Sequence, residues 1–236
     1  MTYKFATCRS NYQDLSSGRV LYNQRGTTAF PVRLASELFQ RCAALLPKSG
    51  PYTVYDPCCG GAYLLTALGF LHRQDIAAIY GSDIDSEVVQ LAGKNLALLN
   101  HAGMERRTDE LQALLEQYKK ESHREAVISA QRLRQMIKEP LASKTFIADI
   151  TNSGLGLKDI DMVITDLPYG ELVQWSGADE EEAIRAMFTN LQPTLAPQGV
   201  VAVVIRKKIV INPMGYKRLA RFKVGRRQAF IFTRVR

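Results

Sequence analysis

Short apolar strands alternate with amphipathic helices through the middle of the chain, and this alternation limits the possible folds more than any other feature of the sequence. It predicts a mainly parallel sheet with helices on both faces. Four of the expected strands end at or just before an aspartate, namely Asp56, Asp83, Asp149 and Asp166. Because ligands bind outside the carboxyl ends of the strands in such sheets, we expect these four carboxylates to line one site.

The periodicity of apolar residues sets the expected boundaries of these elements. Strands are expected at residues 54–56, 76–81, 144–148, 161–165 and 200–205, and helices at residues 62–71, 87–99 and 180–195. A turn at residues 197–199 is expected to lead into the fifth strand. A closing hairpin around Gly225, formed by residues 216–224 and 228–235, completes a seven-stranded, mostly parallel sheet of the α/β class.

Two further segments lie outside the alternation. A helix is expected at residues 31–46, and residues 104–139 are too long for an ordinary connection between two strands. Helical spacing of apolar residues in this second segment predicts an inserted pair of helices. Its mixed charges favour a solvated face over an RNA-binding or dimer-forming arm. We expect the insertion to belong to a single domain that spans residues 1–236.

Composition argues against an exported or membrane-spanning protein. The chain has 236 residues, of which 46% are hydrophobic and 23% are charged, so it can bury a sizeable core without disulfides or metals. It has no apolar run near the roughly 18 residues of a membrane span and no apolar segment typical of a signal peptide. The four cysteines fit neither a zinc site nor a disulfide framework. We therefore expect reduced thiols, no metal, and a monomer in the cytoplasm.

Positive charge is concentrated at both ends of the chain. Residues 1–48 have a net charge of +5 and residues 206–236 one of +11, whereas the residues between them have a net charge of −8. If the two ends lie on one face, they form a positive patch suited to the phosphate backbone of RNA. The expected RNA-binding residues are Trp175, Lys207, Lys208, Lys217, Arg218, Arg221, Lys223, Arg226 and Arg227.

The turn after the first expected strand has the composition of a cofactor-binding loop. Its glycines, Gly60 and Gly61, let the backbone approach a ligand closely, and the helix that follows offers N–H groups to a carboxylate. Asp83 can accept both hydroxyls of a ribose, and Asp149 can accept an adenine amino group. The expected cofactor is S-adenosylmethionine, held by Asp56, Cys58, Gly60, Gly61, Asp83 and Asp149.

Other interpretations of this turn are weaker, although a glycine-rich turn alone is not a specific signal. A nicotinamide dinucleotide is disfavoured because the third glycine of its fingerprint is missing. The acidic residue at the start of the loop also suits a ligand without a pyrophosphate. The adjacent Cys58 and Cys59 could form a reactive pair, but small residues that fill a tight turn are the favoured interpretation.

The turn after the fourth expected strand resembles the Asp/Asn-Pro-Pro-Tyr loop of amino-methyltransferases, and here it reads Asp166-Leu167-Pro168-Tyr169. Asp166 and the backbone carbonyl of Leu167 can accept the hydrogens of an exocyclic amine. Pro168 stiffens the loop, and Tyr169 can stack on the base. Trp175, further along, fits stacking on the substrate and packing equally well.

Leu167 occupies the position of the first proline in such loops, so the sequence is compatible with more than one methylated atom. Asp166 could instead accept a proton from a ring nitrogen of guanine. Carbon methylation of cytosine is disfavoured, because it needs a cysteine nucleophile after the proline and Tyr169 occupies that place.

Three stretches together resemble the avilamycin-resistance 23S rRNA guanine methyltransferase family (AviRa). They are residues 26–35 (GTTAFPVRLA), 56–60 (DPCCG) and 165–171 (TDLPYGE), with Trp175 and Gly177 after the last. The resemblance implies a Rossmann-like class I methyltransferase fold, S-adenosylmethionine as cofactor, a guanosine of 23S rRNA as substrate, and a role in resistance to orthosomycin antibiotics. It also implies that Phe30 and Arg33 lie near the cofactor. One departure is Gly61-Ala62, where such loops often have Ser-Gly.

Two other functions stay open at this point. A tRNA or rRNA amino-methyltransferase that acts on adenine or on the exocyclic amine of guanine would share the catalytic loop but not residues 26–35. A non-catalytic RNA-binding protein with the same fold is disfavoured by the intact Asp56, Asp83 and Asp166. A methyltransferase for small molecules or proteins would not need the basic ends. Free rRNA and an assembled ribosomal particle are equally compatible with the sequence as substrates.

Overall fold

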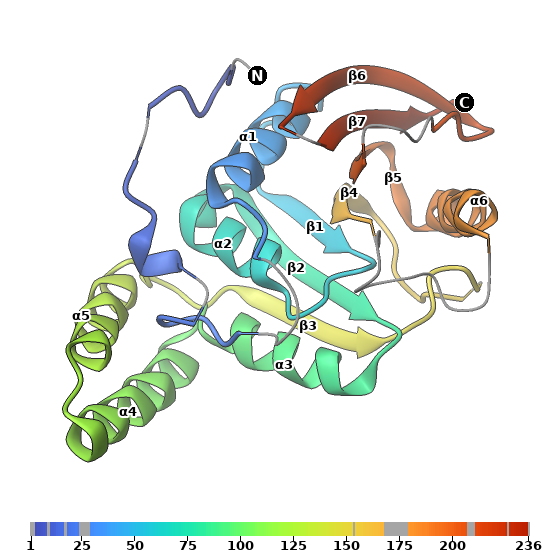
Figure 1. Cartoon of the computed structure of the whole chain (residues 1–236). Helices are drawn as coiled ribbons and strands as arrows, with labels where there is room; N and C mark the ends of the chain where they lie inside the picture. Colours follow the sequence, from blue (N-terminus) through green and yellow to red (C-terminus); the bar gives the residue numbers. More distant parts are fainter. Residues whose placement is uncertain are drawn as a thin grey trace.

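A seven-stranded sheet forms the centre of the computed structural model, with strand order β3-β2-β1-β4-β5-β7-β6 (Figure 1). The structure describes residues 3–8, 10–16, 18–23, 29–152, 154–167, 179–206, 211–225 and 227–235. The strands are β1 (Tyr52–Asp56), β2 (Ile76–Asp83), β3 (Ala142–Ile147), β4 (Ile160–Asp166), β5 (Leu195–Arg206), β6 (Tyr216–Val224) and β7 (Arg227–Arg234).

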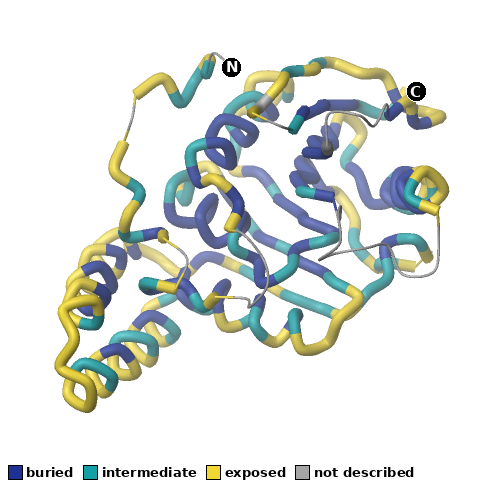
Figure 2. Tube along the Cα trace, in the orientation of Figure 1, coloured by how far each residue is buried: buried dark blue, intermediate teal, exposed yellow. Residues whose placement is uncertain are grey.

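Helices cover both faces of this sheet, as the sequence predicts. The helices in the described part of the chain are α1 (Val32–Ala43), α2 (Tyr63–Leu71), α3 (Ser86–Ala97), α4 (His101–Tyr118), α5 (Glu121–Gln135) and α6 (Glu180–Leu191). Two clusters of buried apolar side chains fill the interior, one beneath α1 to α5 and the other between the sheet and α6. Figure 2 shows the buried strands between these layers. None of the described helices is both long and apolar enough to cross a membrane.

The order of the strands places a switch point beside β1. The chain passes outward from β1 to β2 and β3 and then returns to β4 on the other side of β1, and all the pairs from β3 to β5 are parallel. β7 pairs antiparallel with β5, and β6 antiparallel with β7, which is the expected closing hairpin. In open sheets of this kind, a ligand binds at the switch point, outside the carboxyl ends of the strands. The topology therefore directs the search for a site to the ends of β1, β2 and β4.

The boundary between α6 and β5 differs from the sequence prediction. The helix ends at Leu191 instead of residue 195, because a short 3-10 turn containing Pro193 follows it and proline disfavours a helical residue before it. β5 already begins at Leu195, and the expected turn at 197–199 lies inside it as an irregularity in its pairing with β4. A Cβ atom on Gly199 would lie 2.7 Å from the carbonyl oxygen of Ile160, so only glycine fits this close approach.

The expected helical insertion is the pair α4 and α5, which projects from the sheet at one side (Figure 1). Met104 and Leu111 of α4 pack with Ala126, Ala130 and Leu133 of α5, and all five are buried. The N-terminal part of the chain, which precedes α1, starts beside that helix. It then passes the helical pair and returns to the start of α1 (Figure 1). The insertion therefore contacts a segment that precedes it by about a hundred residues in the sequence.

Candidate functional site

The carboxylates at the ends of β1 and β2 are joined through the loop that the sequence singles out. Asp56 accepts a hydrogen bond from the N–H of Cys58 at 3.1 Å, and Asp83 accepts one from the N–H of Gly60 at 3.0 Å. The N–H of Cys59 also bonds the carbonyl of Ser82 at 2.9 Å. The loop thus bends back over the end of β2, which brings Asp83 to the glycines as expected.

The close approach of this loop to β2 depends on Gly81, which sequence reasoning missed. A Cβ atom on Gly81 would lie 3.1 Å from the Sγ of Cys59 and 3.1 Å from a methyl carbon of Leu65. Contacts this short are tighter than a Cβ atom usually makes, so the side chains of Cys59 and Leu65 would have to move by a few tenths of an ångström. A glycine at the end of an apolar strand is the signal that could have identified this residue.

The positions of the two adjacent cysteines, Cys59 buried and Cys58 partly buried, support their interpretation as small residues that fill the turn. Cys59 is 7% exposed and belongs to the apolar core, and its thiol lies 3.3 Å from the carbonyl of Gly60. Burial raises the pKa of both the Cys58 and the Cys59 thiols well above the ordinary value, and the charge of Asp56 raises them further. Since the thiolate is the reactive form of cysteine, this environment disfavours a reactive pair.

Asp56 is the most buried of the carboxylates in the site, with an exposed fraction of 2%. Burial raises its pKa to about 7, and the charges of Asp83 and Asp166 act in the same direction, against the hydrogen bond from Cys58. Burial also raises the pKa of Asp83, although backbone N–H groups of Asp85 and Gly60 oppose the shift. The site therefore places the carboxylates of Asp56 and Asp83 close together, where little water is present to stabilise their negative charge.

This donor set fits S-adenosylmethionine. Its ammonium and sulfonium groups are cations, and a cation beside a buried carboxylate offsets the cost of ionising it. The hydroxyls of its ribose suit the carboxylate of Asp83. A pyrophosphate would instead place further negative charge beside Asp56 and Asp83. Among the described residues, no group of three or more His, Cys, Asp or Glu side chains is arranged to hold a metal ion.

The raised pKa of Asp56 predicts how the free protein responds to pH. Between about pH 4 and pH 7 the folded state binds a proton at Asp56 that the unfolded state has released, so stability should fall as pH rises through this window, by up to about 4 kcal/mol. Asp56→Asn keeps an oxygen for the N–H of Cys58 and should remove this part of the pH dependence. Urea unfolding of both proteins at several pH values measures the difference. Parallel curves for the two proteins would contradict the assignment.

Asp149 lies after β3 as expected, but its carboxylate already binds its own turn. It accepts hydrogen bonds from the N–H and hydroxyl of Thr151 at 2.9 and 2.6 Å and from the side chain of Asn152 at 2.8 Å. Two apolar side chains near Asp83, Ile84 and Ile147, are 51% and 61% exposed. Ile147 pairs with Asp83 across β2 and β3.

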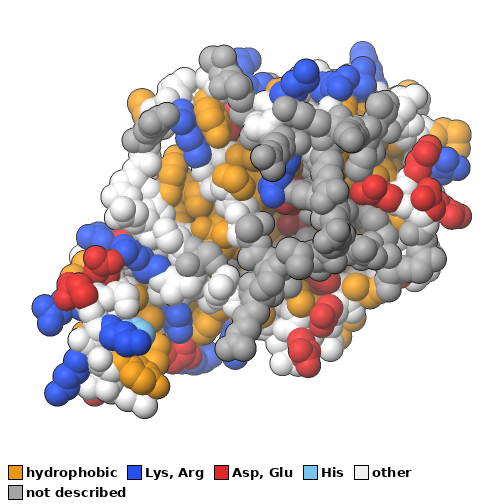
Figure 3. Space-filling model, viewed as in Figure 1, with side chains coloured by type: hydrophobic (Ala, Val, Ile, Leu, Met, Phe, Trp, Pro, Cys, Tyr) orange, Lys and Arg blue, Asp and Glu red, His pale blue; other side chains and the backbone are white. Residues whose placement is uncertain are grey.

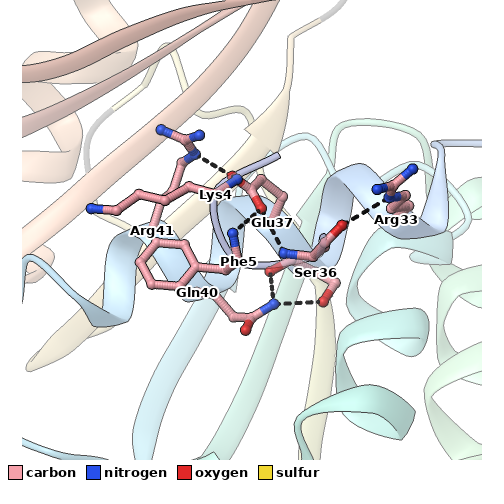
Figure 4. Close-up of polar contacts among 8 residues, drawn as sticks. Lys4, Phe5, Arg33, Ser36, Glu37, Gln40 and Arg41 are labelled. Carbon is pink, nitrogen blue, oxygen red and sulfur yellow. Dashed lines mark hydrogen bonds and ion pairs between the residues drawn. The ribbon is translucent and has the colours of Figure 1, made fainter. Parts of the chain in front are cut away.

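The structure places Phe30 and Arg33 differently relative to the site. Phe30 is buried just before α1, and its ring lies 6.0 Å from the guanidinium of Arg227. Arg33 instead binds the N-terminal segment: it donates to the carbonyl of Ala6 at 2.9 Å (Figure 4) and to that of Thr7 at 2.8 Å. These hydrogen bonds join Arg33 to the N-terminal segment, whereas the resemblance implied that it lies near the cofactor.

Asp166, at the end of β4, forms an ion pair with Arg227 at the start of β7, with 3.2 Å between the carboxylate oxygen and the guanidinium nitrogen. The sequence placed Arg227 among the RNA-binding residues of the tail, but the structure brings it to the proposed catalytic carboxylate. Leu167 is 2% exposed and packs in the core beneath α6, and its N–H bonds the carbonyl of Val204 at 3.1 Å. Its side chain thus anchors the start of the loop. Pro168, Tyr169 and Trp175 lie outside the described residues.

Basic side chains gather along the edge strand β6. Figure 3 shows Lys and Arg side chains over this part of the molecule. Lys217, Arg218 and Lys223 are exposed, and Arg221 is exposed but bonds the side chain of Gln228 at 2.9 Å. The expected residues Lys207, Lys208 and Arg226 lie outside the part of the chain that the structure describes.

The two basic ends of the chain lie side by side, as the positive-patch hypothesis requires. The buried carboxylate of Glu37 on α1 accepts the N–H groups of Lys4, Phe5 and Ala6 at 2.7 to 2.9 Å and also pairs with Arg41 (Figure 4). Arg41 in turn lies 4.3 Å from the ring of Phe222 on β6. Although burial opposes ionisation, these hydrogen bonds hold the pKa of Glu37 below its ordinary value. Glu37 is a second residue that sequence reasoning missed.

Comparison with known proteins gives a match over almost the whole chain. A profile of the family described as rRNA methyltransferase AviRa matches residues 1–227. The chain is 40% identical over 238 aligned positions to the 23S rRNA (guanine(2535)-N(1))-methyltransferase of Streptomyces viridochromogenes, and the match covers 97% of this chain and 94% of that protein.

Solved structures agree with the sequence match. The rRNA methyltransferase AviRa from Streptomyces viridochromogenes is similar with a TM-score of 0.90 and 38% identity, over 99% of this chain and 96% of that one. TrmN from Thermus thermophilus is similar with a TM-score of 0.56 and 15% identity, over 88% of this chain and 50% of that one. At 15% identity, the second likeness shows the fold alone.

Proposed function

Because the chain belongs to the AviRa family of rRNA methyltransferases, we propose that it methylates N1 of a guanosine in 23S rRNA. The methyl donor is S-adenosylmethionine. The acceptor atom is the one named for the relative that is 40% identical over 97% of this chain. The ion pair between Asp166 and Arg227, at the end of β4, is the structural observation that carries the proposal.

Asp166 acts as the base in this proposal. N1 of guanine carries a hydrogen, and its lone pair becomes nucleophilic when that proton leaves. The carboxylate of Asp166 takes the proton. S-adenosylmethionine, when bound, would supply the methyl group from its sulfonium: the S–CH3 bond would break as the bond to N1 forms, and S-adenosylhomocysteine would leave. Arg227 holds the carboxylate in one orientation. A base whose N1 reaches Asp166 also brings O6, the neighbouring acceptor, within reach of the same guanidinium.

Asp56, Asp83 and Gly60 form the cofactor-binding part of the proposed site, with Gly61 and Cys58 in the same loop. The target base has to leave its stack to reach Asp166, and an aromatic residue in the segment after β4 would hold it there. This chemistry depends on alignment and charge placement, so it requires no metal ion. An alternative acceptor is the exocyclic amine of guanine or adenine, for which Asp166 and the carbonyl of Leu167 would both accept hydrogens.

Methyl transfer to RNA fractions tests the proposed function. The purified protein is incubated with labelled S-adenosylmethionine and separate fractions of 23S rRNA, 16S rRNA, tRNA and assembled large subunits. We expect label in 23S rRNA or the large subunit, and 1-methylguanosine as the modified nucleoside by mass spectrometry. An amino-methylated guanosine or adenosine would replace the proposed acceptor with the alternative, and label confined to tRNA would refute the proposed substrate.

The exposed basic residues of β6 should bind RNA through its phosphates. Changing Lys217, Arg218 and Lys223 together to Gln should weaken RNA binding about tenfold or more at low salt and lower the slope of log affinity against log salt by about three. A matched triple change on the helical pair and its C-terminal end, Arg124, Arg134 and Lys138 to Gln, should have little effect. Filter binding at several salt concentrations measures both slopes. Equal salt-dependence slopes for the two variants would show that β6 is not part of the RNA-binding surface.

The biological role follows from the resemblance and forms a separate part of the proposal. We propose that the protein acts as a monomer in the cytoplasm and confers resistance to orthosomycin antibiotics by modifying their target. A sensitive host that expresses the active protein should grow at higher antibiotic concentrations than one that expresses an Asp166→Asn variant. Equal sensitivity of the two strains, with the rRNA modified in only one, would indicate a housekeeping role.

A further inference from the structure

Asn95 on α3 is a fully buried polar residue whose side chain joins two distant backbone segments. Its Oδ1 accepts the N–H of Tyr22 at 2.8 Å, and its Nδ2 donates to the carbonyls of Tyr22 at 3.0 Å and Gly61 at 2.8 Å. These partners fix the orientation of the amide, because the N–H of Tyr22 requires an oxygen opposite it. One side chain therefore ties the loop after β1 to the N-terminal part of the chain.

That loop has a conformation that needs support. Ala62, directly before α2, has a φ of +55° and is fully buried. The left-handed region costs a residue with a Cβ about 1 kcal/mol, and such residues persist where their surroundings determine the backbone more than once. Asp83 holds the N–H of Gly60 on one side of the turn, and Asn95 holds the carbonyl of Gly61 on the other.

The other segment that Asn95 contacts, the N-terminal one with Tyr22, also packs against the start of α2. We call residues 12–16 and 18–23 the strap. Its side chains Leu15, Val20 and Leu21 are buried in the core, and the hydroxyl of Tyr63, the first residue of α2, donates to the carbonyl of Leu15. The strap therefore contacts both the start of α2 and the amide of Asn95.

The inserted helices hold the strap from outside. The carboxylate of Asp14 accepts hydrogen bonds from the hydroxyl of Ser129 at 2.7 Å and from the guanidinium of Arg132 at 2.8 Å, both on α5. Arg107 on α4 donates to the carbonyl of Val20 at 2.8 Å. A continuous series of contacts thus runs from α4 and α5 through the strap and Asn95 to Gly61.

We propose that Asn95 is a positioning residue for methyl transfer, which couples the inserted helical pair and the strap to the cofactor loop. By holding the carbonyl of Gly61 against α3, it fixes the turn that presents Gly60 and the start of α2. The helical pair then serves the cofactor site as a scaffold for the strap. This inference rests on the cofactor-binding role proposed for the loop.

Asn95→Ala tests the proposal against Asn100→Ala as a matched control. Asn100 also bridges a backbone N–H and carbonyl, those of Leu141 at 2.8 and 3.5 Å, but it does not bond the loop. We expect Asn95→Ala to raise the KM for S-adenosylmethionine and the Kd for S-adenosylhomocysteine about tenfold, with kcat at saturating cofactor within about threefold of the original. Asn100→Ala should lower the Tm and leave KM within about twofold. A lowered Tm with an unchanged KM for Asn95→Ala would overturn the proposal.

A remote change keeps the test decisive if Asn95→Ala does not fold. Asp14→Asn weakens the hold of α5 on the strap from a partly exposed position and should raise the KM for S-adenosylmethionine about threefold without changing kcat. Arg124→Gln, which breaks an exposed ion pair within α5 that does not include the strap, should leave KM unchanged. An unchanged KM in Asp14→Asn would refute the coupling between the helical pair and the cofactor loop. If Asp83→Ala still weakens cofactor binding in the same experiments, the proposed cofactor-binding role of the loop would stand.

Discussion

Replacing Asp166 by Asn should lower kcat for methyl transfer by about 100- to 10,000-fold while the Kd for S-adenosylmethionine stays within about threefold. The expected loss arises because an amide cannot take the N1 proton, although it keeps the size and one oxygen of the carboxylate. Asp166 lies at the end of β4 and pairs with Arg227, and we propose that it acts on the base rather than on the cofactor's ribose. Single-turnover assays with 23S rRNA and calorimetry with the cofactor separate the two effects.

A control at the opposite end of the same strand, just outside it, guards against a general effect of removing charge. Asp159 is exposed just before β4, at the end opposite Asp166, and its φ of +56° is one that asparagine tolerates. Asp159→Asn should therefore leave both kcat and cofactor affinity unchanged. Full activity of Asp166→Asn would remove Asp166 from the catalytic step and with it the proposed mechanism.

Replacing Asp83 by Ala should raise the Kd for S-adenosylmethionine at least about 100-fold, with a much smaller change in kcat at saturating cofactor. Hydrogen bonds to a charged group contribute about 1.5 to 3 kcal/mol each, and the carboxylate of Asp83 is expected to accept two from the ribose. The change also removes the acceptor for the N–H of Gly60, which loosens the loop from β2. Isothermal calorimetry measures the affinity directly.

Asp85, two residues further on, provides the matched control. Its carboxylate caps α3 by accepting the N–H groups of Glu87 at 2.8 Å and Val88 at 3.3 Å. Asp85→Ala should reduce stability by about 1 kcal/mol and leave cofactor affinity unchanged. If the two variants lose cofactor affinity equally, the ribose assignment of Asp83 is wrong and the loss reflects a general disturbance of the β2–α3 turn.

The parts of the fold that could be predicted are those encoded by neighbouring residues. Apolar periodicity located the strand ends within about two residues, except at the start of β5, because most of these strands are buried on at least one face. The boundary at Pro193 was less predictable, since a 3-10 turn and an irregular first part of β5 satisfy the same apolar pattern as a longer helix.

The same distinction holds in the candidate site. Asp56, Gly60 and Asp83 could be identified because each follows a strand, and parallel strands end at the same edge of a sheet. The residues that sequence reasoning missed, Gly81 and Asn95 among them, act on side-chain or backbone atoms of other segments. The residues next to Gly81 and Asn95 in the sequence do not indicate which distant atoms these two residues contact.

By itself, the sequence determined the alternation of strands and helices, the loop of glycines beside two carboxylates, and the resemblance to a methyltransferase family. Only the tertiary structure decided that Arg227 meets Asp166 across 61 positions and that Asn95 meets Gly61 across 34. The physical reason is that helix and strand periodicity is local, whereas these pairs depend on the order of strands in the sheet and on where α3 and the hairpin pack against it.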